Sequence, residues 1–431
     1  MTLERHRTSR AITGAWGLFA ALGLLMLGNG LLGTLLGIRS ELEGFATTVT
    51  GAIMASYYVG FLFGSRIAPK TMERVGHVRV FAALASLASA APLVHSVFVE
   101  PVLWAAMRFV FGFCMAGLYV VAESWLNQAA TNETRGRLLS AYMLVMMGGL
   151  GVSQLFIGVA APTGFKLFVL ASLFVSLAVV PISLSQGTAP VFHSPETLSA
   201  TKVWQVAPLG IIGGIGAGLT SGALVGIGPV YATQVGFSST EVAWVIGAAL
   251  AGSLVWQWPI GLMSDRIPRR RAILLVAALG AVVAAAGAQS NTPSLTNLLV
   301  VMFFLGGLTF PLYSVVLSHI NDVISYNQAV AASSLYVFVN GLGAILGPLL
   351  AALAIEGIGV SGFFGVIGGA HALVAIYALV RITVKPATLS PNEQTPWRPF
   401  PARAGVVLAR LTKARRPDEG TQPRGANGRM R

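Results

Sequence analysis

The chain contains one short charged loop twice, as Glu73-Arg74-Val75-Gly76-His77-Val78-Arg79 and as Asp265-Arg266-Ile267-Pro268-Arg269-Arg270-Arg271. The second copy begins 192 positions after the first, and each copy follows the second long apolar run of its half of the chain. Both copies have an acid, an adjacent Arg, a Gly or Pro that favours a turn, and further basic residues. The repeat indicates a duplicated membrane protein with this loop at the bilayer surface.

The composition supports a protein dissolved in lipid. Hydrophobic residues make up 55% of the chain and charged residues only 10%, with a mean hydropathy of +0.75. So few charges cannot cover the surface of a water-soluble protein of 431 residues. The formal net charge of +13 needs no nucleic-acid partner, because the basic residues lie in short connections between apolar runs and in the C-terminal tail.

Twelve apolar runs are long enough to cross a hydrocarbon core about 30 Å thick. The predicted fold is therefore an all-α integral membrane protein, with twelve transmembrane helices in two pseudo-symmetric six-helix bundles. The expected spans lie near 11–36, 45–67, 78–99, 102–124, 138–161, 165–184, 207–231, 240–263, 272–289, 295–317, 329–354 and 362–382.

Lys and Arg are concentrated in alternate connections, which predicts the orientation. Three Arg precede the first run, and the connection between the second and third runs and that between the eighth and ninth hold four basic residues each. Because basic residues beside spans stay in the cytoplasm, both termini are expected there, in the cell inner (plasma) membrane. The expected organisation is a cytoplasmic N-terminus at 1–10, a six-helix bundle at 11–184, a central cytoplasmic loop at 185–206, a second bundle at 207–384 and a basic, mostly disordered cytoplasmic tail at 385–431.

Within the tail, residues 404–416 alternate apolar and basic residues at helical spacing. This pattern suits a helix lying on an anionic membrane surface. A solvated basic tail is the alternative interpretation.

Several motifs resemble the major facilitator superfamily. The stretch Gly261-Leu262-Met263-Ser264-Asp265-Arg266-Ile267-Pro268-Arg269-Arg270 is similar to its loop signature G-x-L-x-D-R-x-G-R-R, with Pro268 in place of the usual Gly. In the first copy, Pro69 replaces the leading Gly and Glu73 the Asp. The stretch Arg108-Phe109-Val110-Phe111-Gly112 resembles the superfamily's fourth-helix pattern, and Glu123-Ser124-Trp125-Leu126-Asn127 resembles a poorly characterised bacterial permease branch. The resemblance implies a monomeric secondary transporter working by alternating access.

The repeated loops and their neighbours are the candidate cytoplasmic gate. An acid at the end of one span beside Arg residues at the start of the next can pair across the cytoplasmic side of a cavity and close it. The alternative is that these charges only anchor the spans at the membrane surface. The gate candidates are Glu73, Arg74, Arg79, Glu123, Arg135, Arg137, Asp265, Arg266, Arg269 and Arg270.

Polar and aromatic residues inside the apolar runs are candidates for a substrate cavity near the bilayer midplane, between the halves. Arg108 is the most informative, because a charge inside a span usually faces a cavity or a partner. Snorkelling towards the outer surface is the alternative for Arg108, and packing between helices is the alternative for the others. The candidates are Asn29, Tyr57, Tyr58, Arg108, Tyr119, Gln154, Tyr231, Gln234, Trp256, Gln257, Tyr313 and Asn340.

The motifs leave three hypotheses for function. One is a carrier of a small polar or anionic solute, and the second is a multidrug-type, proton-coupled efflux carrier with an aromatic cavity of Tyr57, Tyr58, Trp256 and Tyr313. The third is a non-transporting membrane receptor or scaffold. No phosphate-binding loop, metal-ligand spacing or catalytic triad is recognisable, so neither an enzyme, a cofactor nor a metal is expected. The expected partners are a small-molecule substrate and the lipid bilayer. Proton coupling and uniport, and import and export, all stay open.

Overall fold

A computed structural model describes residues 16–129, 134–184, 204–289, 292–324 and 328–384, together with Gln394 and Trp397. The expected N-terminal segment, most of the central loop and most of the tail, including the helix suggested at 404–416, lie outside these residues.

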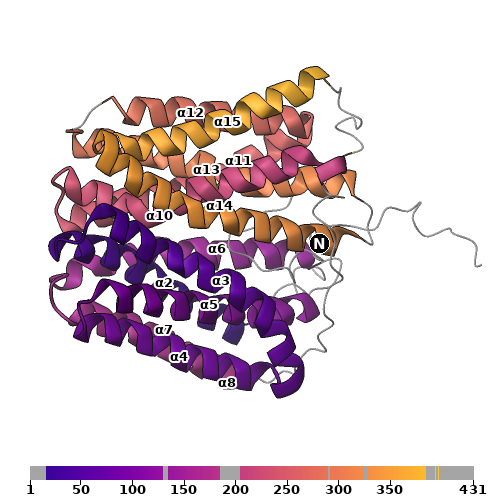
Figure 1. Ribbon diagram of the computed structural model, residues 1–431. Helices are drawn as coiled ribbons and strands as arrows, with labels where there is room; N and C mark the ends of the chain where they lie inside the picture. The colour runs from indigo at the N-terminus through magenta and orange to yellow at the C-terminus, as the bar shows by residue number, and fades with distance from the viewer. Residues whose placement is uncertain are drawn as a thin grey trace, which may run out of the picture.

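The described residues fold into long helices joined by short turns (Figure 1). The first half consists of α2 (Trp16–Leu42), α3 (Thr47–Val75), α4 (His77–Val97), α5 (Pro101–Ala129), α6 (Arg135–Ser153), the 3-10 helix η1 (Gln154–Val159), α7 (Lys166–Leu177) and α8 (Val179–Leu184). The second half consists of α10 (Pro208–Gln234), α11 (Ser239–Arg266), α12 (Arg269–Gly287), α13 (Leu295–Val323), α14 (Ala329–Ile358) and α15 (Gly362–Val384).

These helices confirm the predicted all-α membrane fold. Within the described chain, eleven helical segments are long and apolar enough to cross a membrane, with η1 continuing α6 and α8 continuing α7. The twelfth is α3, whose 29 residues give it the length but whose end contains Arg66, Lys70, Glu73 and Arg74. In Figure 1 the helices of the first half, in indigo to purple, lie below those of the second, in magenta to yellow.

Local sequence explains how sharply some helices begin and end. Gly76 adopts φ +92°, a conformation that favours glycine, so α3 and α4 are separated by this one residue. Ser238 and Glu241 form a capping box at the start of α11, where the backbone N–H of Ser238 donates to Glu241 Oε2 at 2.8 Å.

The helices define two faces of the molecule. We call the one where α2 begins and α15 ends the terminal face, and the one that contains the turns after α2 and α10 the opposite face. Both repeated charged loops, between α3 and α4 and between α11 and α12, lie at the terminal face. The structure therefore brings the two copies to the same side of the protein, as the duplication predicts.

Packing inside the two halves repeats as well. A side chain added at Gly112 of α5 would meet the backbone carbonyl of Tyr57, and one added at Gly306 of α13 would meet that of Ala249. Gly306 follows Gly112 by 194 positions, and Ala249 follows Tyr57 by 192. The same close α3–α5 and α11–α13 contacts thus support the pseudo-symmetry at the level of single residues.

At the opposite face, small residues and polar contacts close the interface between the halves. Gly37 of α2 lies against Pro229 of α10, and Gly51 of α3 lies against Pro348 of α14. Glu356 Oε1 accepts hydrogen bonds from the backbone N–H and the hydroxyl of Thr48, at 2.8 and 3.1 Å. Nearby, Gln234 Nε2 donates to Glu41 Oε1 at 3.1 Å and to Thr47 Oγ1 at 2.8 Å.

The contact between α10 and α14 gives a prediction about stability. A Cβ added at Gly218 would overlap the carbonyl oxygen of Asn340, whereas one added at Gly369 meets no atom within 4 Å. Overpacking costs about 1–3 kcal/mol. We therefore expect Gly218→Val to lower the thermal unfolding midpoint in detergent, and Gly369→Val to leave it nearly unchanged. Equal midpoints for the two variants would contradict close packing at Gly218.

Candidate substrate cavity

A cavity lies between the halves, and both halves contribute to its wall. Its lining residues come from α2, α3, α5, α6 and η1 on one side and from α10, α11, α13 and α14 on the other. The space open to the centres of water-sized molecules is about 70 Å³, which is room for several waters. The cavity is therefore suited to a small solute in this conformation.

Arg108 is the charged residue in the cavity wall, and its side chain is held by an aromatic ring. It lies in the second turn of α5 and is only 6% exposed. Its guanidinium carbon lies 4.6 Å from the centroid of the Tyr57 ring, a cation–π contact. Tyr57 in turn makes an edge contact with Tyr58, with ring centroids 5.2 Å apart. The Tyr57 ring thus supports a positive charge inside an apolar region.

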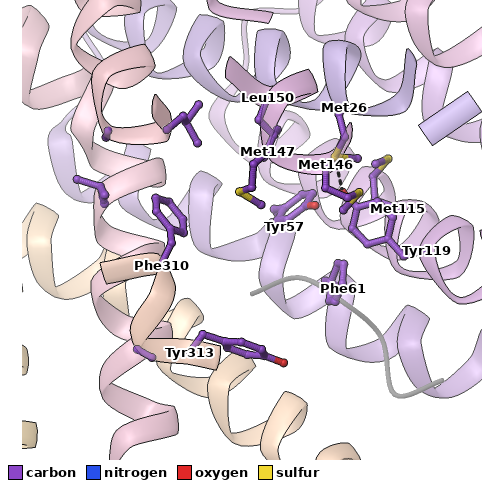
Figure 2. Close-up of a cluster of buried hydrophobic side chains, with 14 of the residues drawn as sticks. Met26, Tyr57, Phe61, Met115, Tyr119, Met146, Met147, Leu150, Phe310 and Tyr313 are labelled. Carbon is purple, nitrogen blue, oxygen red and sulfur yellow. Dashed lines mark hydrogen bonds between the residues drawn. The ribbon is translucent and has the colours of Figure 1, made fainter. Parts of the chain in front are cut away.

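Asn29 is held by a tyrosine behind the wall. Its Nδ2 donates to the Tyr119 hydroxyl at 3.4 Å, and that hydroxyl donates to Met26 Sδ at 3.5 Å. Figure 2 shows Met26, Met115 and Phe61 around the Tyr119 ring. Tyr119 therefore does not line the cavity but fixes the position of a residue that does.

Gln154 reaches the cavity where α6 ends. The chain tightens into η1 directly after Ser153, and Gln154 is the first residue of that segment. Its Oε1 accepts a hydrogen bond from Thr34 Oγ1 at 2.9 Å, and its Nε2 donates to Ser153 Oγ at 3.0 Å. This polar pair joins α2 to η1 within the first half.

The second half contributes fewer polar groups. Asn340 Nδ2 donates to the backbone carbonyl of Gly214 at 3.1 Å, so the amide also ties α14 to α10. Phe310 of α13 supplies an aromatic surface facing the same space (Figure 2). The cavity is polar mainly on the first-half side.

Six of the predicted cavity residues line this space, namely Asn29, Tyr57, Tyr58, Arg108, Gln154 and Asn340. The other six lie outside its lining, most of them in contact with neighbouring helices. Besides Tyr119, these are Tyr231 stacked on Phe363 with centroids 4.9 Å apart, Gln234 at the opposite face, Trp256 5.7 Å from Phe304, Gln257 donating to Ser314 Oγ at 3.0 Å and Tyr313 4.8 Å from Tyr336.

The sequence did not single out the remaining lining residues, which are small or apolar. They include Gly30, Gly33, Thr34, Met54, Phe61, Met147, Ser221 and Phe310. Such residues are common in every transmembrane helix, and only the Gly-x-x-Gly-Thr spacing of α2 could have indicated a helix face made of small side chains.

Glu123 lies one turn beyond Tyr119 on α5, towards the terminal face. It is fully buried, and its Oε1 accepts a hydrogen bond from the hydroxyl of Tyr142 on α6 at 3.0 Å. The tyrosines have counterparts in the second half, since Tyr313 and Tyr336 follow Tyr119 and Tyr142 by 194 positions each. At that spacing Glu123 corresponds to Leu317, so the carboxyl group belongs to the first half alone.

The gate candidates lie at or near the terminal face, in different surroundings. Arg269 is 3% exposed and pairs with Asp265 at 2.9 Å and with Asp322 at 3.1 Å. Arg270 Nη1 donates to the backbone carbonyl of Arg381 at 3.3 Å. The side chains of Glu73, Arg74, Arg79, Arg137 and Arg266 are exposed, and that of Arg135 lies outside the described residues.

Within the described ranges, no three His, Cys, Asp or Glu side chains are grouped closely enough to hold a metal ion. The described lining residues offer one guanidinium, a few amides and hydroxyls, and aromatic rings. These groups can bind and orient a solute.

Comparisons with known sequences cover both halves. A family model described as Major Facilitator Superfamily matches residues 210–417, and one described as Sugar (and other) transporter matches residues 27–183. An uncharacterised MFS-type transporter of Enterobacter sp. (strain 638) is 31% identical over 348 residues, covering 79% of this chain and 88% of the relative. Another, of Yersinia pestis (strain Pestoides F), is 28% identical over 388 residues, covering 88% and 97%.

Solved structures show the same fold at low identity. The nucleoside transporter NupG superposes with a TM-score of 0.70 at 12% identity, covering 86% of this chain and all of that one. A bacterial homologue of the human lysosomal transporter Spinster, inward-facing and unoccupied, gives a TM-score of 0.64 at 13% identity, covering 94% and 97%.

Proposed function

Since this chain belongs to the major facilitator superfamily, we propose that it is a secondary carrier that moves a small organic anion across the bacterial inner membrane. The observation that supports this most directly is Arg108, a buried cation in the wall of the cavity between the halves. A charged side chain that faces a cavity inside a membrane protein often marks the path of a substrate. A solute carboxylate could accept two parallel hydrogen bonds from the guanidinium.

The rest of the wall restricts the solute further. Tyr58, Phe61 and Phe310 offer apolar and aromatic surface, whereas Asn29 and Gln154 offer amides. An anion with a small apolar or aromatic body would satisfy both kinds of surface. We therefore infer an amphipathic organic monoanion rather than a sugar, which would need more hydrogen-bonding side chains.

Alternating access follows from the arrangement of the two halves. We propose that the terminal face is cytoplasmic, because the basic loops gather there. The contacts at Gly37, Gly51 and Thr48 then close the cavity towards the outside. In the opposite state these contacts would separate and the charged loops of the two halves would approach each other.

We also propose that transport is coupled to a proton carried by Glu123. Its carboxyl group is fully buried between the cavity and the terminal face, where protonation removes the cost of burying a charge. Among the described residues, the titratable groups near it include Tyr142, which donates to it, Tyr119 one turn earlier, and Tyr313 of α13. Through Tyr119 and Asn29, polar groups connect this region to the cavity.

A cavity-filling variant tests whether the protein transports at all. A side chain at Gly33 would point into open space in the cavity wall. We expect Gly33→Trp to reduce solute flux into proteoliposomes at least tenfold while the protein stays folded. Gly369→Trp is the matched control, because Gly369 is exposed on α15 and no atom lies within 4 Å of the position that a Cβ would take there. If neither variant alters the flux of any transported solute, this cavity is not the transport path.

A multidrug-type carrier remains the second candidate, favoured by the aromatic residues of the wall. Of the four aromatics on which that hypothesis rested, Tyr57 and Tyr58 line the cavity, joined by Phe61 and Phe310. A thermal-shift screen of the purified protein separates the candidates. Stabilisation by small organic anions supports the proposal, whereas stabilisation by lipophilic cations alone would favour the multidrug function.

A further inference from the structure

Trp397, a residue of the C-terminal tail, contacts the charged loop between α11 and α12. Its backbone N–H donates to Asp265 Oδ1 at 2.8 Å. Asp265 is the acid of the second loop copy, and the same oxygen, Oδ1, pairs with Arg269 Nη2 at 2.9 Å. Trp397 thus occupies a hydrogen-bond acceptor of Asp265, the residue expected to gate the terminal face.

The indole ring of Trp397 rests on α11 one turn before Asp265. Its six-membered ring lies so close to Gly261 that a Cβ at that position would overlap it. In the first loop copy, 192 positions earlier, the corresponding residue is Pro69, whose ring would fill this space. Only the second copy therefore has a surface on which the indole can lie.

Gln394 adds a second contact to the same loop. Its Nε2 donates to the backbone carbonyl of Ile267 at 3.4 Å. With the amide turned over, it would donate to Ser264 O at 3.2 Å and accept from the backbone N–H of Arg269 at 3.3 Å. Either orientation joins the tail to the turn between α11 and α12.

These contacts connect to a buried network. Arg269 pairs with Asp322 of α13 at 3.1 Å and donates to Ser264 Oγ at 2.6 Å. The side chain of Asp265 is 34% exposed, so it marks the outer edge of this network, and Trp397 lies over that edge.

We propose that Gln394 and Trp397 form a latch that holds the terminal face apart while the opposite face is sealed. The latch occupies Asp265 and the surface at Gly261, and it must leave before the charged loops of the two halves can meet. The tail then sets how often the carrier changes state. This inference rests on the proposed alternating access between the two faces.

A double-mutant cycle tests the latch. The cavity position Gly33 is changed to Cys in a Cys114→Ala background, and labelling by a membrane-impermeant maleimide is measured from each face without solute. Trp397→Ala removes the indole ring, and Gly261→Ala places a Cβ where that ring lies. Each change should raise the labelling rate from the opposite face at least threefold. The double variant should show no further increase, because both changes break one contact.

Trp258→Ala is the matched control, since it removes an indole from the exposed side of α11, where Trp258 is 69% exposed. Its labelling should match that of the parent, and size-exclusion profiles should show that all variants are folded. Unchanged labelling in Trp397→Ala, or effects that add up in the double variant, would overturn the latch. The labelling cycle needs no solute. It can therefore contradict the latch while the flux experiment with Gly33→Trp supports the proposed function, and it can support the latch when the flux experiment does not support that function.

Discussion

Replacing Arg108 by alanine is expected to abolish transport of an organic anion in a protein that is still folded and inserted. The guanidinium lies in the cavity wall over the Tyr57 ring, and in this proposal it binds the solute's carboxylate. Truncating one partner of a buried, hydrogen-bonded charge pair costs about 2–5 kcal/mol. Solute affinity should therefore fall by roughly 30-fold or more, measured by binding to purified protein and by flux into proteoliposomes.

Two variants make this result interpretable. Arg108→Lys keeps the charge but loses the planar fork, so affinity should fall while some transport remains. Arg66→Ala removes an exposed guanidinium that lies 4.4 Å from the ring centroid of Phe338, outside the cavity lining, and should leave affinity unchanged. Full transport by Arg108→Ala would remove this residue from the solute site, and equal loss of folded protein and flux would make it structural.

Glu123→Gln is expected to abolish accumulation driven by a proton gradient while solute exchange continues. The amide keeps the size of the carboxyl group and an oxygen that can accept from Tyr142, but it cannot bind and release a proton. The loss should therefore appear when a pH gradient drives uptake. Counterflow between equal pH on both sides should stay within about twofold of the parent, because the cavity residues are unchanged.

Glu241→Gln is the control for this measurement. Glu241 lies in the exposed capping box of α11, a position where glutamine is also accepted. Gradient-driven accumulation should therefore persist in Glu241→Gln. If Glu123→Gln still accumulates solute against its gradient, the coupling proton is bound elsewhere; if it loses counterflow too, Glu123 is needed for the conformational change itself.

The apolar runs were enough to predict the helices, because a span is defined by its length and composition. Helix ends were less accurate: α3 continues to Val75 rather than 67, and α13 to Val323 rather than 317. In both cases polar and charged residues extend the helix beyond its apolar segment. Hydropathy reports where lipid ends and not where the backbone hydrogen bonds end.

The sequence indicated which types of residue could line the cavity, but not which way each side chain points. Tyr57 and Tyr119 were both recognisable as polar aromatics inside spans, yet only Tyr57 lines the cavity, because the rotation of each helix is set by packing against its neighbours. Gln257 donates to Ser314 within the second half for the same reason. The contact of Trp397 with Asp265 left no sequence signal, because it joins residues 132 positions apart through one backbone N–H.

The glycine and proline contacts that seal the opposite face have a thermodynamic consequence. Gly37, Gly51, Pro229 and Pro348 have few or no side-chain rotamers to lose when the helices meet or to regain when they part. In the proposed alternating-access cycle, opening this face would therefore change side-chain entropy little, and water could replace the bonds around Thr48 and Gln234. The binding energy of the solute would then not have to offset a large side-chain entropy difference between the two states.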